Sequence, residues 1–245
     1  MKRLAAVGLM VVLTVLLVSL SAGNAQAGSL NGELKFEYWP AWVIAMQGNY
    51  QFASWYTAML GLQLRLRVPN TPLSWHLEYL GGVQTQQTGY WQNSSGRDKL
   101  VRTYFSYPFF DNDQLKLAGT MGWGKIGWDT DFGGGNREVF RSAGVLVGLY
   151  AAWTIKHNLD LYSKVTFQPM NTVTIANANT WTSTGSMTDW QVGLHYKPSF
   201  GNIDFGYRSV KAYTGDNFAC PDCMFGWTGW FLKFGIPLGQ RTRVQ

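Results

Sequence analysis

The sequence is poor in charge, cysteine and long apolar runs, and each shortage excludes a class of protein. Only 14% of the 245 residues are charged, and the formal net charge of +6 is too mild to indicate a nucleic-acid partner. Two cysteines, Cys220 and Cys223, cannot complete a four-ligand zinc site. Beyond the N-terminal segment, the longest near-apolar stretch is Ala143 to Ile155, shorter than the about 20 residues that a membrane-spanning helix needs.

The first 27 residues have the pattern of a signal peptide. Lys2 and Arg3 precede an apolar run that ends at Leu20, and Ala25-Gln26-Ala27 forms a small-x-small cleavage site. An uncleaved membrane anchor is the alternative, but no positive charge directly follows the apolar run. We therefore expect a signal peptide at 1–27 and one mature domain at 28–245, which begins at Gly28.

Glycine and aromatic residues are abundant in what remains. The chain contains 28 glycines and 12 tryptophans, and 16% of its residues are aromatic. Aromatic side chains favour the interface between membrane and water. A chain without an apolar helix but with these residues calls for another way of crossing a membrane.

Ten segments with two-residue periodicity follow the signal peptide, separated by alternating long and short breaks. The short breaks carry turn-forming residues, as in Pro69-Asn70-Thr71-Pro72 and His157-Asn158. The segments are Glu33–Ala41, Ala58–Val68, Leu73–Val83, Lys99–Phe110, Leu115–Lys125, Val139–Lys156, Leu159–Gln168, Ser186–Lys197, Asn202–Thr214 and Phe225–Pro237. Long breaks come first and last, which is the order of an up-and-down barrel with short turns on one side and long loops on the other.

The pattern predicts an all-β fold, a membrane-spanning antiparallel up-and-down β-barrel of ten strands with both termini in the periplasm. Residues 62–68 show why: leucine and valine alternate with Gln63, Arg65 and Arg67, as on a strand with lipid on one side and a polar lumen on the other. Trp123 and Trp128 are expected in the aromatic girdle near the outer side. The alternative is a soluble sandwich, which rarely places arginine and lysine on the buried face of so many strands.

The last predicted strand carries a second signal. Its "WTGWFLKF", Trp227 to Phe234, resembles the closing strand of the small outer-membrane β-barrel proteins of Gram-negative bacteria, although eleven residues follow Phe234. The resemblance covers essentially all of 28–237 and implies the outer membrane as location, its lipid as surroundings, and the barrel-assembly machinery as a partner during insertion. No cofactor and no nucleic acid are expected, and no extracellular partner can be named.

Successive side chains of a strand point to opposite faces, so whether a residue faces the lumen depends on its parity, the odd or even position along the strand. Parity places a set of charged side chains in the predicted lumen. The set comprises Lys35, Glu37, Arg65, Arg67, His76, Glu78, Arg102, Lys116, Asp160, Lys164, Asp204, Arg208 and Lys233. One interpretation is a core closed by salt bridges; the other is a narrow water-filled passage that favours small anions. Eight basic residues against four acidic ones, with His76 left out, leave a surplus of positive charge that a fully paired core would not need but that water could solvate.

Two kinds of enzyme remain as alternatives. Ten strands is also the size of the omptin proteases, and Asp129 and Asp131 supply an Asp-x-Asp on a predicted outer loop, although no histidine is paired with an aspartate as that site requires. These two aspartates could instead bind calcium weakly or form a plain polar loop. A lipid-modifying site would need a serine, a histidine and a carboxylate together, and Ser74, His76 and Glu78 share a face but lie about 7 Å apart.

The expected function is therefore non-enzymatic, with no catalytic residue assigned. We expect a structural or surface-interaction protein with a salt-bridged lumen; the alternatives are the anion-preferring pore and a rim-sited hydrolase that acts on lipid A or peptides. Cys220 and Cys223 are expected to form a disulfide that tightens the last outer loop.

Overall fold

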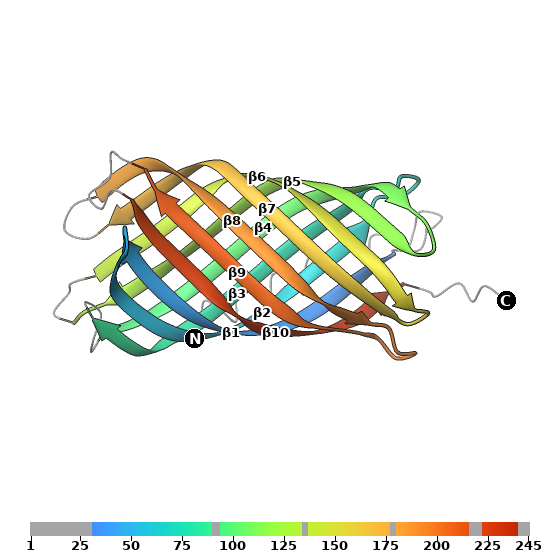
Figure 1. Ribbon diagram of the computed structural model, residues 1–245, viewed down its shortest axis with the longest axis horizontal. Coiled ribbons are helices and arrows are strands. Elements are labelled where there is room, and N and C mark those ends of the chain that lie inside the picture. Colours follow the sequence, from blue (N-terminus) through green and yellow to red (C-terminus); the bar gives the residue numbers. More distant parts are fainter. Residues whose placement is uncertain (1–30, 90–93, 134–136, 177–179, 216–221, 240–245) are drawn as a thin grey trace, which may run out of the picture.

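Ten antiparallel strands form a closed barrel in the computed structural model, which describes residues 31–89, 94–133, 137–176, 180–215 and 222–239 (Figure 1). The strands are β1 (Gly32–Gln47), β2 (Tyr50–Arg67), β3 (Ser74–Gly89), β4 (Ser95–Asp111), β5 (Leu115–Asp131), β6 (Arg137–Lys156), β7 (Leu159–Ala176), β8 (Thr180–Tyr196), β9 (Asn202–Thr214) and β10 (Cys223–Leu238). In the described residues no helix is long and apolar enough to span a membrane. The predicted signal peptide lies outside the described residues.

The first and last strands pair with each other and close the sheet. Phe36 lies opposite Phe234 and Glu37 opposite Lys233 in the register of β1 with β10. The ladder is interrupted near Pro40, which has no backbone N–H to donate, and resumes at Trp42. The number of strands and the barrel are confirmed, and a soluble sandwich of two separate sheets is excluded.

The two ends of the barrel differ, and each is given a name here. At the terminal end, where β1 starts and β10 stops, the connections are 68–73, 112–114, 157–158 and 197–201. At the distal end they are 48–49, 90–94, 132–136, 177–179 and 215–222. The strands cross obliquely from one end to the other (Figure 1).

The prediction of long distal loops was wrong at four of the five positions, because the strands continue through most of those predicted loops; the last connection, 215–222, is close to the predicted 215–224. In β5 the pairing with β6 extends to Asp131, five residues beyond Ile126, where the loop was expected to begin. Along this extension the polarity of the two faces is inverted: Ile126 and Trp128 point inward and are buried, while Asp129 lies on the outer face. The outer face therefore stops being apolar at this point, although the backbone pairing of the two strands continues.

A belt of large apolar side chains covers the outside of the barrel. On β6, Leu149 and Trp153 are each 62% exposed, whereas the inward Leu146 and Ala152 are buried. The same arrangement holds on the other strands; exposed belt residues include Phe36, Leu60, Tyr107, Phe109, Met121, Trp123, Val165, Trp190, Phe205, Trp230, Leu232 and Phe234. An apolar surface this extensive suits hydrocarbon and not water.

Candidate functional site

The barrel interior has three layers along its axis, and together they form the candidate site. Inward residues of β1 read Glu33, Lys35, Glu37 and Trp39 from the terminal end, so charged side chains give way to aromatic ones. We call the layers the vestibule at the terminal end, the ion-pair layer in the middle and the aromatic plug toward the distal end.

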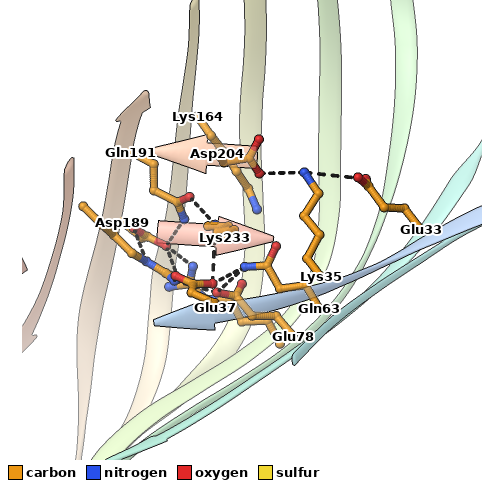
Figure 2. Close-up of polar contacts among 12 residues, drawn as sticks. Glu33, Lys35, Glu37, Gln63, Glu78, Lys164, Asp189, Gln191, Asp204 and Lys233 are labelled. Atoms are coloured by element: carbon orange, nitrogen blue, oxygen red, sulfur yellow. Dashed lines mark hydrogen bonds and ion pairs between the residues drawn. The ribbon is translucent and has the colours of Figure 1, made fainter. Parts of the chain in front are cut away.

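The ion-pair layer consists of Glu37, Glu78, Arg102, Asp189, Arg208 and Lys233. Arg208 on β9 contacts three carboxylates: Glu78 at 2.6 Å, Asp189 at 2.8 Å and Glu37 at 3.3 Å. Because Glu78 lies on β3, with three strands between it and β9 on the shorter way round, its contact with Arg208 crosses the lumen. Figure 2 shows the converging carboxylates.

Two further cations complete this layer. Arg102 on β4 pairs with Asp189 on β8, again from the far side of the barrel. Lys233 lies 3.4 Å from Glu37 and donates to the Gln191 side chain at 3.3 Å. All the paired groups are nearly inaccessible to solvent, so each charge depends on its partners for stabilisation.

The aromatic plug consists of Trp39, Trp55, Trp128, Phe140, Phe225 and Trp227, all at most 2% exposed. Phe140 on β6 and Phe225 on β10 have ring centroids only 4.3 Å apart. Trp128 on β5 lies 5.9 Å from Phe225, and β5 and β10 are diametrically opposite, with four strands between them either way. Rings from opposite walls of the barrel therefore lie close together at this level.

One buried carboxylate fixes the orientation of two plug residues. Asp98 on β4 accepts hydrogen bonds from the indole N–H of Trp55 at 3.0 Å and of Trp227 at 2.9 Å. Both indoles thus have a polar partner inside an apolar layer, which buried tryptophans usually require. These bonds connect β2, β4 and β10 across the interior.

The vestibule is a cavity of about 590 Å³ at the terminal end. Lys35 lies 2.6 Å from Asp204 and 3.5 Å from Glu33, and Lys197 lies 2.5 Å from Asp160. Figure 2 draws both contacts of Lys35. Its wall mixes these pairs with the unpaired Arg65, Arg67 and Lys164, for which no carboxylate lies within 4.0 Å in the described residues.

Every side chain predicted to face the lumen lies on the inner face in the structure. Glu37, Glu78, Arg102, Arg208 and Lys233 are in the ion-pair layer, and the others line the vestibule: Lys35, Arg65, Arg67, His76, Lys116, Asp160, Lys164 and Asp204. Sequence reasoning missed the inward acidic residues Glu33, Asp98 and Asp189, and it also missed Asp111 and Lys197, which line the vestibule. Asp189 is two residues from Gln191 on the same strand, so the alternation in the sequence already placed it on the polar, lumen-facing side.

The residues considered for catalysis lie apart or are engaged otherwise. Asp129 is on the outer face and pairs with Arg137, whose guanidinium lowers the pKa of the Asp129 carboxyl below its usual value. Ser74 accepts a hydrogen bond from Arg65, and Glu78 accepts one from Arg208. Within the described chain no hydrogen bond joins Ser74 or Glu78 to His76.

The structure does pair one histidine with an aspartate, contrary to expectation. His195 on β8 and Asp204 on β9 are register neighbours, and the His195 ring nitrogen contacts the carboxylate. This pair lies in the vestibule, at the opposite end of the barrel from Asp129. No group of three or more metal-ligating side chains occurs in the residues that the structure describes.

The cysteines and one girdle residue complete the comparison with the predictions. Cys223, at the start of β10, is disulfide-bonded, while Cys220 lies outside the described residues. Trp128, expected at the membrane interface, is instead a buried part of the plug. Its parity is opposite to that of Trp123, which does lie on the outer surface and is 40% exposed.

Comparison with known proteins places this fold. The sequence matches no protein-family model and no curated protein. Among solved structures, the outer membrane protease OmpT of Escherichia coli is similar with a TM-score of 0.52 and 8% identity, covering 89% of this chain and all of that one. The translocator domain of the autotransporter NalP of Neisseria meningitidis gives a TM-score of 0.51 at 9% identity, covering 97% of both chains. Together with its apolar outer belt, this shows that the chain has the fold of the Gram-negative outer-membrane β-barrel proteins.

Proposed function

We propose that this protein is a closed, non-conducting outer-membrane barrel that acts through its outer surface and distal rim, with the terminal end facing the periplasm. The contact between Phe140 and Phe225 carries the proposal, because it joins distant walls of the lumen. The ion-pair layer supports it independently, since Arg208 and Arg102 also bridge the interior. Solute would have to displace both layers in order to pass.

The outer surface offers a feature that suits a membrane-integrated role. Lys99, Gly127 and Arg141 lie side by side in register on β4, β5 and β6, and Gly127 has no side chain to separate the two cations. Lys125 lies two residues along β5, on the same outer face and closer to the apolar belt. A basic group at the edge of an apolar belt is complementary to anionic lipid headgroups.

The anion-preferring pore is the alternative in the same membrane, and conductance separates the two. We expect the purified full-length chain, inserted in planar bilayers, to give no steady current above the lipid baseline. Insertion must be verified in the same preparation by heat-modifiable gel migration, so that failed insertion is not mistaken for a closed lumen.

A steady current would contradict the closed lumen. If that current also lost its anion preference in Arg65→Ala and Arg67→Ala, the pore would replace the proposed function. Phe140→Ala/Phe225→Ala removes the ring contact of the plug, and Phe205→Ala/Trp230→Ala is its matched control. This control removes a stacked pair, with centroids 5.3 Å apart, from the outer surface. We expect noisier or transient currents only from the plug variant.

A further inference from the structure

Three of the cations that line the vestibule form no ion pair with the described chain. Each of the other cations that line it has a carboxylate nearby: Lys35 with Asp204, Lys116 with Asp111, Lys197 with Asp160 and Lys233 with Glu37. Arg65, Arg67 and Lys164 have none within 4.0 Å among the described residues. An unpaired charge in a confined site is costly unless water or a counter-ion compensates it.

The two deeper members of this set, Arg65 and Lys164, have hydroxyl groups as their hydrogen-bond partners. An Arg65 terminal nitrogen lies 3.4 Å from the Ser74 hydroxyl. The Lys164 ammonium donates to the Tyr104 hydroxyl at 2.7 Å and lies 4.1 Å from the centre of the Tyr104 ring. Neither contact supplies a negative charge. Both side chains retain free N–H donors that can face the cavity.

His76 adds a second, independent observation. Its ring stacks on Tyr104 with centroids 4.6 Å apart, and its Nε2 is buried without a hydrogen-bond partner in the described part of the chain. Buried polar atoms are nearly always hydrogen-bonded, so an unpartnered one in the wall of a cavity calls for an explanation. Here it lies beside the same tyrosine that holds Lys164.

We propose that the vestibule is a binding site for a small organic oxyanion, with its phosphate or carboxylate group held between Arg65 and Lys164. A guanidinium provides a fork of donors that matches such a group, and an ammonium adds a compact charge. The cavity of about 590 Å³ is larger than an inorganic ion needs and lies within the range of small-molecule sites. The ligand enters from the terminal end and leaves the same way, because the ion-pair layer closes the other side.

Binding is tested on the purified full-length chain in nonionic detergent, by calorimetric titration at constant ionic strength. Inorganic phosphate and citrate are the probes, one for each headgroup chemistry, and chloride is the reference. We expect at least one probe to bind and to raise the unfolding temperature, with no effect of chloride. Whichever probe binds more tightly identifies the headgroup class.

The variants locate the site. Arg65→Gln and Lys164→Gln should each weaken binding about tenfold, the loss that corresponds to one charge-assisted hydrogen bond. Lys116→Gln is the matched control: it also lines the cavity and loses one charge, but its ammonium is half-exposed and 3.4 Å from Asp111. Arg65→Lys keeps the charge but loses the fork of donors, so it should weaken binding less than Arg65→Gln does, and this difference separates loss of charge from misfolding.

Two outcomes would overturn the proposal: no binding of either probe above chloride, or equal weakening by Lys116→Gln and Lys164→Gln. The second result would show diffuse attraction to a basic surface. Neither outcome bears on closure of the lumen, which conductance tests separately.

Discussion

Replacing Arg208 with methionine is expected to destabilise the folded barrel by about 3–5 kcal/mol. The substitution leaves Glu37, Glu78 and Asp189 buried without the guanidinium that contacts all three. Arg102 still pairs with Asp189, and Lys233 with Glu37, so Glu78 suffers the largest loss. The measurement is urea-induced unfolding in lipid vesicles, followed by gel migration and tryptophan fluorescence.

The matched control is Arg67→Met, which removes the same group from an exposed position in the vestibule. We expect a change below about 0.5 kcal/mol, as is usual for surface substitutions. Adding Glu78→Met to Arg208→Met should restore part of the stability, because a carboxylate left alone is worse than no ion pair. Equal stability of the Arg208 and Arg67 variants would show that the cross-lumen network does not form.

A charge placed in the outer belt should have an effect of similar size. Leu149→Arg puts a guanidinium on the outer face of β6, where the leucine is 62% exposed between the equally apolar Val147 and Trp153. Arginine on the lipid face near the middle of a barrel costs about 2–4 kcal/mol. Unfolding in vesicles measures this cost directly.

Tyr50→Arg is the control for the belt. Tyr50 is even more exposed, at 71%, but it starts β2 beside the distal turn and lies beyond the belt. We expect near-wild-type stability from this variant. If Tyr50→Arg were as destabilising as Leu149→Arg, or if both were neutral, the belt would not be the lipid-facing surface.

Much of the fold could be predicted from the sequence because each strand carries its own record of which face is polar. Arg65, Glu78 and Arg208 each lie at a parity that separates them from leucines, tryptophans and tyrosines, and all three point inward in the structure. That local record requires no knowledge of neighbouring strands. The same alternation placed Lys35 and Asp204 in the lumen, but it did not predict that they form an ion pair.

Parity gives the face of a side chain but not its height along the axis or its partner. Arg208 is 130 residues from Glu78, and their contact depends on strand tilt and on the stagger of the closed sheet. The plug was missed for a second reason: beyond the belt the apolar face turns inward, so Trp128 and Phe140 look like a break in the pattern. Asp98 was missed as well, because the indole N–H groups of Trp55 and Trp227 that donate to it come from other strands and cannot be read from its own strand.

We expect a barrel with lipid outside and a packed, dry aromatic plug inside, and fluorine NMR of the protein labelled with 5-fluorotryptophan in lipid nanodiscs tests both parts at once. Each resonance is assigned by a single Trp→Phe substitution. The reagents are a lipid-borne nitroxide and a water-soluble gadolinium chelate, which broaden the signals they approach.

We expect the lipid reagent to broaden the outward tryptophans Trp42, Trp123, Trp153, Trp190 and Trp230, which are 40–62% exposed. Trp39, Trp55, Trp128 and Trp227, at most 2% exposed, should be broadened by neither reagent. Broadening of these four by the aqueous chelate would mean a water-filled lumen, and protection of the outward five from the lipid reagent would mean that the belt does not face the membrane.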